Sequence, residues 1–407
     1  AANELISNRC ELYRTNYPET KLFEGDIWKL RKEIIDWTAS NLSDEELFLI
    51  YATPPCQGMS TNGYGKLQAE ISAGRRNPID ERNRLVIPAL EIISELKPKW
   101  VLFENVPGMK DTVISTDEGL KNILDFIKGQ LGSEYVGCGE VISCADYGIP
   151  QLRKRLITIF TRDENGKKYF HANKGSFFAN EDKLSFTSLK DAIGHLPPLD
   201  GKEGSNKCLD FHPLHYVNSM GPDKYWWVSN TPEGETAYNN QCVNAECLHQ
   251  ENARHIDLKE NGKWISSKKT PIYCEKCGSL LPRPTMLDKS TKERRLIKGF
   301  HSAYRRMWFH EASRTLTRNF PFEASDNKIH PTQNRVLSVY EALVVQTISD
   351  YQYEWVVKNK HATRSLIAQA IGESVPPKLI DLIVKKIIGI SNDDIIAKGQ
   401  LDLFCTG

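Results

Sequence analysis

The sequence predicts an α/β fold with parallel strands in its central sheet, and three neighbouring segments carry this prediction. A short apolar run at residues 47–52 is followed by two prolines and is typical of a buried strand. Apolar residues then recur at helical spacing over residues 85–96, and "WVLFENV" at residues 100–106 predicts the next strand. A strand, a helix and a second strand in this order form a βαβ unit of a parallel sheet.

The composition is that of a globular protein. The chain has 407 residues, 40% of them apolar and 26% charged, which is enough for two or three domains. No apolar stretch approaches the length that crosses a bilayer, and no charged-then-apolar leader opens the chain, so we expect a cytosolic or nuclear protein without membrane contact. Six of the ten cysteines are scattered, as expected in a reducing compartment.

Cys56 comes just past the first predicted strand, in "TPPCQGMS". Ligands of open α/β sheets bind beyond the carboxyl ends of strands, so a thiol at this place can meet a substrate. A small apolar filler in a turn is the alternative for this segment taken alone.

Two further groups of polar residues lie near predicted strand ends. Glu104 and Asn105 end the second strand, where burial raises the pKa of a carboxyl and lets it hold a proton near neutral pH. Arg153 and Arg155 are two residues apart beside the strand-like "LITIF", so in an extended segment both project from one face and could grip a phosphate or carbonyl oxygen. A capping carboxylate and a charged edge strand are the alternatives.

Four cysteines form two close pairs, in "CVNAEC" and "CEKC". Two such pairs can bring four thiolates to one tetrahedral Zn²⁺, as in a zinc ribbon over residues 242–277. Turn-rich surroundings favour a structural metal, because little apolar packing is available there. Disulfides or idle thiols are the alternatives, and His249 or His255 could replace one ligand. The predicted ligands are Cys242, Cys247, Cys274 and Cys277.

Positive charge is concentrated in one segment, although the whole chain carries a formal charge of only +1. Residues 281–320 contain ten Lys or Arg and three acids, with aromatic residues and histidines between them. This pattern favours contacts with nucleic-acid phosphates and bases, and a solvated helix face is the alternative. Near the chain end, apolar spacing after Pro376 predicts a last helix.

Several segments, in this order, resemble the DNA (cytosine-5) methyltransferase family of prokaryotic modification enzymes. They are "NELISNRCELYRTNYPETKLFEGDI", "TPPCQGMS", "FENVPG", "YGIPQLRKR", "RTLTRNF", "HPTQNRVLSVYEAL" and "QAIGESVPPKL". The resemblance spans almost the whole chain except an insert between about Lys190 and Ala312. It implies a Rossmann-like S-adenosylmethionine-dependent methyltransferase domain with a smaller, zinc-stapled target-recognition domain.

The resemblance implies a role for each catalytic candidate. Cys56 matches the nucleophile whose thiolate adds to cytosine C6, which makes C5 reactive toward the methyl group. Glu104 matches the acid that protonates or hydrogen-bonds N3, and Asn105 matches the residue that holds the Cys56 loop. Arg153 and Arg155 match the pair that contacts the base carbonyl and its surroundings. The cytosine must be flipped out of the duplex for this chemistry.

The resemblance also implies a cofactor site for S-adenosylmethionine. Glu4 matches the acid that binds the ribose hydroxyls. Asp26 and Ile27 match residues that contact the adenine ring. Pro54 and Leu85 match other residues that line this pocket, and Val375 matches the segment that returns to cover the cofactor.

Two departures from the family pattern stand out. The family usually has Asn where this chain has Glu373. The glycine-rich turn expected before Glu4 is absent, so we expect either an N-terminal segment beyond the given residues, which the exposed edge of an incomplete sheet favours, or a separate polypeptide that supplies it.

The expected organisation is a catalytic domain over residues 1–188, a target-recognition domain over residues 189–340 and a C-terminal segment, residues 341–407, that returns to the catalytic domain. We expect an enzyme of the bacterial cytoplasm that acts on double-stranded DNA and works with restriction or other defence-system proteins. A zinc ribbon that binds a protein remains open for the insert. The alternatives for the whole chain are a tRNA cytosine-5 methyltransferase and a DNA-binding subunit that is inactive without a partner.

Overall fold

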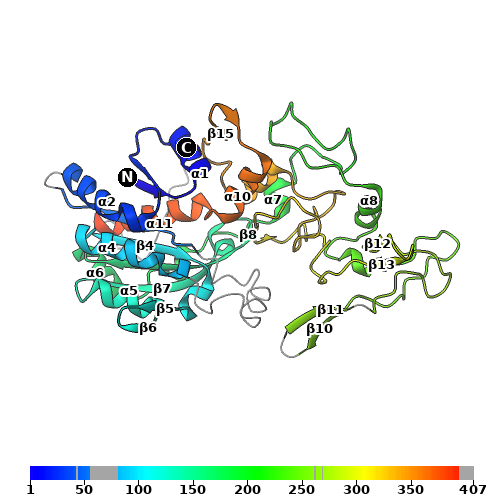
Figure 1. The fold of residues 1–407 in the computed structure, drawn as a ribbon, viewed down its shortest axis with the longest axis horizontal. Helices are drawn as coiled ribbons and strands as arrows, with labels where there is room; N and C mark the ends of the chain where they lie inside the picture. The colour runs from blue at the N-terminus through cyan, green and yellow to red at the C-terminus, as the bar shows by residue number, and fades with distance from the viewer. Residues whose placement is uncertain (43–44, 56–80, 261–262, 268, 394–407) are drawn as a thin grey trace.

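The computed structural model describes residues 1–42, 45–55, 81–260, 263–267 and 269–393, so Cys56 lies outside the described residues. Figure 1 shows an elongated molecule with two lobes. The larger lobe holds the main sheet and most helices, and the smaller lobe consists mainly of loops and short hairpins.

The main sheet has the strand order β3-β4-β9-β7. The strands β3 and β4 run parallel and the helix α4 lies between them in sequence, which confirms the predicted βαβ unit. The strand β9 is antiparallel to both β4 and β7, so the sheet as a whole is mixed rather than parallel. Because β9 is central, the alternative of a charged edge strand is wrong. The elements are β3 (Leu49–Ala52), α4 (Val86–Leu96), β4 (Trp100–Asn105), β7 (Val136–Ser143) and β9 (Lys154–Thr161).

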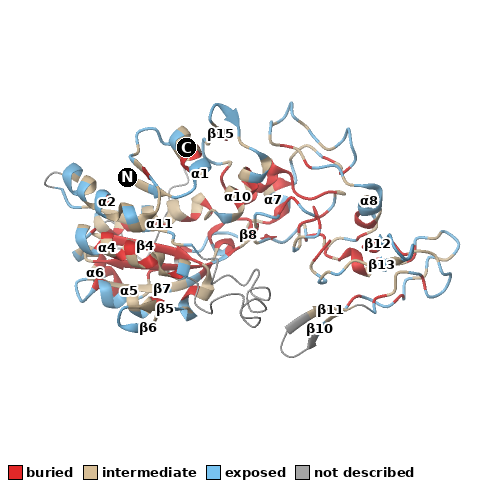
Figure 2. Cartoon of the chain, in the orientation of Figure 1, coloured by how far each residue is buried: buried red, intermediate tan, exposed pale blue. Residues whose placement is uncertain are grey.

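Helices cover both faces of this sheet, whose interior is the most continuous buried region in Figure 2. All six residues of β4 are buried. One face packs on α4 and α5 (Ile123–Leu131), and the other packs on α6 (Glu164–Ala172) and α11 (Pro377–Ser391). The helix α11 begins after Pro376, as the sequence predicts. The sheet is therefore the middle layer of an α/β sandwich.

A second parallel pair of strands opens the chain. The strands β1 (Ala2–Glu4) and β2 (Leu22–Glu24) pair in register and alternate with α1 (Ser7–Asn16) and α2 (Ile27–Leu42). The apolar side of α2 packs against α4 through Ile34 and Ile92. This contact fixes the first strand pair beside the main sheet.

One apolar core joins segments that are distant in sequence and lie between the two lobes. It includes Leu12, Leu189, Leu316, Leu343 and Ile371. The core therefore contains residues from all three segments that the predicted boundaries at 188 and 340 separate. In the same region β14 pairs in parallel with β8. The elements are β8 (Gln151–Leu152), α7 (Leu189–Ile193), β14 (Ser313–Arg314), α9 (Val339–Val345) and α10 (Arg364–Glu373).

We expect Gly372→Ala to destabilise this region. A Cβ at Gly372 would lie 2.1 Å from the backbone nitrogen of Arg318, so α10 could accept a methyl group only by moving away from that segment. Overpacking of this kind costs about 1–3 kcal/mol, and thermal unfolding should show a lower Tm. Gly129→Ala in α5 is the control, because its Cβ would meet nothing within 4 Å. Equal melting of the two variants would contradict the close packing.

The smaller lobe has a sparse core. It is centred on Trp227 of α8 (Pro222–Ser229), Tyr238 and Tyr304. Two hairpins complete the lobe: β10 (Asp257–Glu260) with β11 (Lys263–Ser266), and β12 (Thr285–Leu287) with β13 (Arg294–Leu296).

The remaining elements are short. No helix within the described ranges is long and apolar enough to span a membrane. The hairpins are β5 (Val113–Thr116) with β6 (Gly119–Asn122), and β15 (Val356–Val357) with β16 (Lys360–His361). The 3-10 helices are η1 (Glu81–Leu85), η2 (Pro107–Asp111), η3 (Cys144–Tyr147), η4 (Asn180–Asp182) and η5 (Ala237–Asn239).

Candidate active site

Glu104 and Arg155 form a buried pair at the carboxyl end of β4. Arg155 comes from the neighbouring strand β9, and its Nε lies 2.6 Å from Glu104 Oε1. The side chain of Arg155 is 11% exposed and that of Glu104 is 10% exposed. Burial raises the pKa of the Glu104 carboxyl, and the positive charges of Arg155 and Arg153 offset only part of this shift. The pair therefore places a carboxyl with a raised pKa beside a fixed guanidinium.

Asn105 connects this acid to the segment that carries Cys56. Its Nδ2 donates to the carbonyl oxygen of Pro54 at 3.0 Å, and its Oδ1 accepts from the Val106 backbone at 2.8 Å. Pro54 is two residues before Cys56 in the sequence. The end of β3 is thereby held against the end of β4, at the edge where the sequence predicts the site.

Arg153 plays a different part from Arg155. It lies between β8 and β9, is 1% exposed, and donates to the carbonyl oxygens of Leu316, Gly372 and Ser374 at 2.8 to 3.3 Å. The two arginines thus take different partners, although the positive charges of both lie near enough to Glu104 to offset part of the rise in its pKa. In the described structure Arg153 joins the main sheet to the segment after β14 and to the C-terminal end of α10.

Two buried amides that the sequence analysis did not identify complete this junction. Gln151 is fully buried; its Oε1 accepts from the Leu316 backbone at 2.9 Å and its Nε2 donates to Gln346 Oε1 at 2.7 Å. Gln346 in turn donates to the carbonyl oxygen of Ser374 at 2.7 Å. Such a network follows from contacts between segments almost 200 residues apart, which spacing within one motif cannot reveal.

A second group of predicted residues lies at the carboxyl ends of β1 and β2. Glu4 Oε1 accepts from the backbone nitrogens of Leu5 and Ile6 at 2.8 and 2.9 Å, which fixes the carboxylate. The Gly25 backbone donates to the Glu4 carbonyl at 2.9 Å from a positive φ of 144°. Asp26 Oδ1 accepts from the Trp28 backbone at 3.1 Å at the start of α2. Ile27 begins this helix, so the structure brings Glu4, Asp26 and Ile27 together at one edge.

The C-terminal segment reaches the same edge. Glu373 forms an ion pair with Arg9 of α1, which gives the unusual residue at this position a structural partner. Val375, two residues on, packs against the main-sheet core on the side of α11. Leu85 is half-buried and precedes the first turn of α4.

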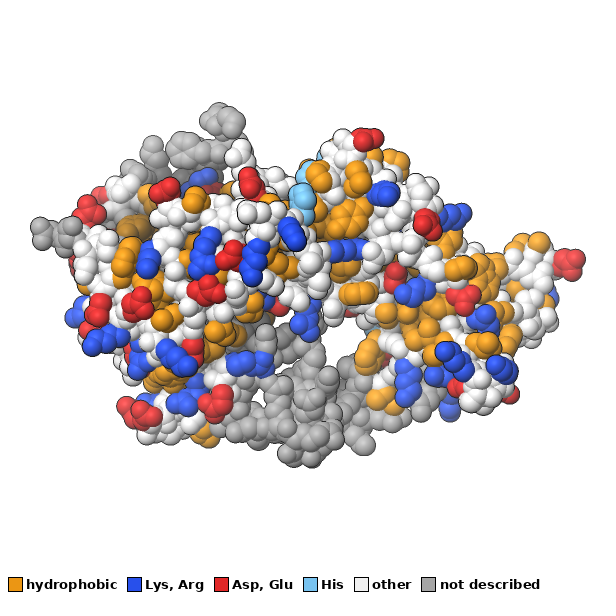
Figure 3. Space-filling view, turned by 45° about the horizontal axis from the view of Figure 1, so that its top comes forward, with side chains coloured by type: hydrophobic (Ala, Val, Ile, Leu, Met, Phe, Trp, Pro, Cys, Tyr) orange, Lys and Arg blue, Asp and Glu red, His pale blue; other side chains and the backbone are white. Residues whose placement is uncertain are grey.

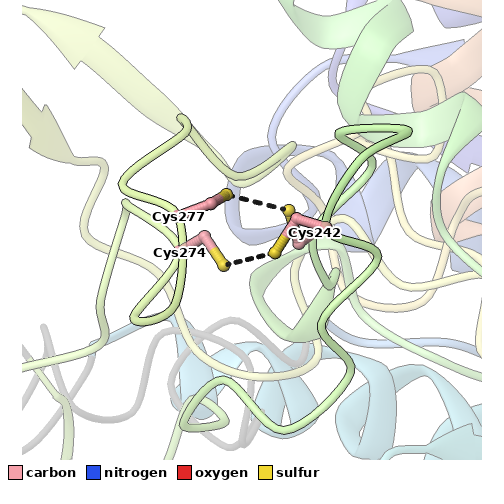
Figure 4. A group of neighbouring side chains, drawn as sticks. Cys242, Cys274 and Cys277 are labelled. Carbon is pink, nitrogen blue, oxygen red and sulfur yellow. Dashed lines mark hydrogen bonds between the residues drawn. The ribbon is translucent and has the colours of Figure 1, made fainter.

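The four cysteines expected to bind zinc converge, as predicted. Their sulfur atoms all lie within 4.8 Å of one another, and Figure 4 shows the two sides of the cluster facing each other. The Sγ atoms of Cys242 and Cys277 are 3.7 Å apart, and those of Cys247 and Cys274 are 3.8 Å apart. Tetrahedral Zn–S bonds of about 2.3 Å place sulfurs about 3.8 Å apart, so the geometry fits. His255 is bound elsewhere, to Thr270 and Gly299.

The basic segment of residues 281–320 divides into structural and exposed cations. Arg283 is buried and donates to the carbonyl oxygens of three residues; Arg306 is buried and binds four more carbonyl oxygens and the Asn334 amide. Most of the other cations are exposed. In Figure 3 blue and orange side chains lie side by side on the smaller lobe, where Phe300 and Trp308 are also exposed.

Comparison with known proteins gives consistent matches. The family model described as C-5 cytosine-specific DNA methylase matches residues 1–389. The chain is 30% identical over 397 residues to the Type II methyltransferase M1.HgaI of Avibacterium volantium, covering 95% of this chain and 90% of that protein. It is 21% identical over 382 residues to the Type II methyltransferase M.DdeI of Desulfomicrobium norvegicum, covering 93% and 80% of the two chains.

A solved structure shows the same fold. An Escherichia coli prophage protein, described as a putative DNA modification methyltransferase, superposes with a TM-score of 0.50 at 18% identity, over 96% of this chain and 92% of that one. The family match covers the strand ends that carry Glu4, Glu104 and Arg155. This chain belongs to the C-5 cytosine-specific DNA methylase family.

Proposed function

We propose that this chain transfers a methyl group from S-adenosylmethionine to C5 of a cytosine flipped out of double-stranded DNA. The observation that carries this proposal is the buried Glu104–Arg155 pair, tied through Asn105 to the segment that leads to Cys56. Family membership supplies the reaction class. The relatives named as Type II methyltransferases favour a role beside a cognate restriction enzyme or another defence protein.

Each side chain has a task in this reaction. The Cys56 thiolate adds to C6, and this addition pushes electron density toward N3 and C5. Protonated Glu104 donates a hydrogen bond to N3, while Arg155 binds the carbonyl oxygen at C2 and neutralises charge that builds on the ring. Asn105 holds Pro54, two residues before Cys56 in the sequence, at the same edge. Arg153 positions this edge through backbone carbonyls.

The residues at the ends of β1 and β2 fit the cofactor. S-adenosylmethionine supplies an electrophilic methyl group on a positively charged sulfur. The fixed Glu4 carboxylate suits the two ribose hydroxyls. Leu5 and Ile6, which directly follow Glu4, are 65% and 45% exposed and provide apolar surface for a bound ligand to cover. Asp26, Ile27, Pro54, Leu85 and Val375 are proposed as further cofactor contacts.

We also propose that the smaller lobe is the core of a target-recognition domain and that Cys242, Cys247, Cys274 and Cys277 hold a structural Zn²⁺ in it. The spacing of the four sulfur atoms supports the zinc site. The apolar packing around the cysteines is sparse and includes Leu281, so a metal would add stability there. Exposed cations on the same lobe suit the phosphates of duplex DNA.

The direct test is methyl transfer from labelled S-adenosylmethionine to duplex DNA. We expect label on cytosine C5 with the unchanged chain and none with Cys56→Ser, because a serine hydroxyl is a far weaker nucleophile than a thiolate. Cys138→Ser is the matched control, since Cys138 lies in β7.

The test also separates the other two functions. A transfer RNA substrate run in parallel should remain unlabelled, and label on it alone would favour the tRNA alternative. A folded chain that binds both DNA and S-adenosylmethionine but transfers nothing would favour a DNA-binding subunit and contradict the proposal.

A further inference from the structure

The smaller lobe contains a hollow that the proposed methyl transfer does not use. Its volume is about 520 Å³, and it lies at the base of the β10–β11 hairpin, where this hairpin meets the loop before Ala303. The chain segments are joined there by Ser266, whose hydroxyl donates to the Gly299 carbonyl at 2.6 Å. The lining residues are His255, Ile256, Asp257, Phe300, His301 and Ser302.

His301 is held in a fixed orientation inside this hollow. Its ring Nδ1 pairs with Asp257 Oδ2, and its backbone nitrogen donates to both oxygens of the same carboxylate at 3.2 and 3.4 Å. The side chain of Asp257 is 9% exposed, whereas that of His301 is 55% exposed. With Nδ1 bound to the carboxylate, Nε2 is the ring nitrogen left for a ligand.

The support behind this pair is also rigid. His255 Nε2 lies 3.6 Å from Asp257 Oδ1, and its ring stacks on Tyr238 with centroids 4.6 Å apart. Its Nδ1 is hydrogen-bonded to Thr270 Oγ1 at 2.6 Å. An exposed histidine usually samples several rotamers, so a buried carboxylate backed by a second histidine is a device that preorganises the ring.

The charge of the lining favours a base edge over a phosphate. The six residues include one carboxylate and no Lys or Arg, so the hollow itself does not attract an anion. Ile256 and Phe300 are 62% and 47% exposed, which provides apolar contacts beside the His301 nitrogen. Base edges in the major groove combine hydrogen-bonding groups with an apolar thymine methyl.

Phosphate contacts have a better candidate outside this hollow. Arg314 of β14 is exposed, and within the described ranges no ion pair or hydrogen bond of its guanidinium is present. It pairs in register with Leu152 of β8, beside Arg153, so it lies at the catalytic edge. The cation that lies against His301 is Arg305, whose Nε donates to the His301 carbonyl oxygen at 3.2 Å and which is therefore already engaged, whereas the guanidinium of Arg314 is available for a phosphate.

We infer that His301, positioned by Asp257, contacts a base edge of the target DNA and specifies one position of the recognition sequence. The inference rests on the proposed function, because it assumes that duplex DNA is the substrate. Asp257 acts as a positioning residue that does not touch the DNA.

The test compares recognition sequences. Plasmid DNA free of cytosine methylation is treated with enzyme and S-adenosylmethionine, and bisulfite sequencing then gives the frequency of each base around the methylated cytosines. For His301→Ala we expect preference at one position to fall about 10-fold, with the other positions unchanged. Asp257→Asn should relax the same position, because it removes the group that orients the ring.

Arg314→Ala is the contrasting variant. It should weaken binding equally for all sequences and reduce the slope of log K against log salt by about 1, as loss of one phosphate contact does. His171→Ala is the matched control, an exposed histidine of α6 outside the basic segment that has no ion pair among the described residues.

The outcomes separate this inference from the proposed function. An unchanged recognition sequence for a folded His301→Ala, or a uniform loss like that of Arg314→Ala, would overturn the base contact. Absence of methylation by the unchanged chain would instead contradict the proposed function.

Discussion

Replacement of Glu104 by glutamine should lower kcat for methyl transfer by about 10²–10⁴-fold, the usual contribution of a positioned general acid. The carboxamide has nearly the same shape and can still contact Arg155, but it cannot deliver a proton to N3. Burial raises the pKa of the Glu104 carboxyl, so in the unchanged chain the protonated form persists to higher pH than in water. Single-turnover rates with labelled S-adenosylmethionine measure the loss.

The rate of methyl transfer should also depend on pH in a direction that the raised pKa of Glu104 determines. Activity that needs protonated Glu104 falls as pH rises through the raised pKa, and this limb should be absent in Glu104→Gln. Stability follows the same direction: because the folded-state pKa lies above the unfolded one, the contribution of the carboxyl is complete below the unfolded pKa and is lost as pH rises through the folded value.

The matched control is Glu46→Gln. Glu46 precedes β3, pairs with Lys99 and Arg162, and lies at the opposite end of β3 and β4 from Glu104. It makes the same change from carboxyl to carboxamide while leaving the active edge intact, so kcat should stay within about 2-fold, as for surface substitutions generally. A similar loss in both variants would show that the effect follows from loss of a carboxyl group near these strands, and not from loss of proton donation to N3.

The sequence was sufficient for features that depend on local pattern. The unit β3–α4–β4 and the start of α11 follow from apolar spacing and prolines, and the convergence of the four cysteines follows from two close pairs. Glu104 and Asn105 were placed correctly at the end of a buried strand.

Features that depend on pairing between distant strands could not be predicted. The contact of Glu104 with Arg155 requires β9 to run antiparallel beside β4, with Glu104 opposite Ile157. The separate partners of Arg153 arise because the chain leaves the sheet ladder between β8 and β9. The sequence also does not show that Arg283 within the basic segment is buried.

Removal of the metal should unfold the smaller lobe and leave the larger lobe folded. We expect one Zn²⁺ per purified chain, and none for Cys274→Ser, because three remaining thiolates hold the metal far more weakly. Structural zinc binding contributes on the order of 10 kcal/mol of folding free energy, and the few apolar residues around Trp227 and Tyr238 could not replace it. Elemental analysis and thermal unfolding, each with and without a chelator, measure both effects.

Two readouts distinguish this loss from general unfolding. Binding of S-adenosylmethionine should survive in Cys274→Ser, since Glu4 and its neighbours lie in the larger lobe, whereas DNA binding should be lost with the exposed cations of the smaller lobe. Cys208→Ser is the control, a cysteine of the predicted recognition domain outside the cluster. If the chain contains no zinc and Cys274→Ser melts like the control, the four thiols are not a metal site, and apolar packing alone must hold the lobe together.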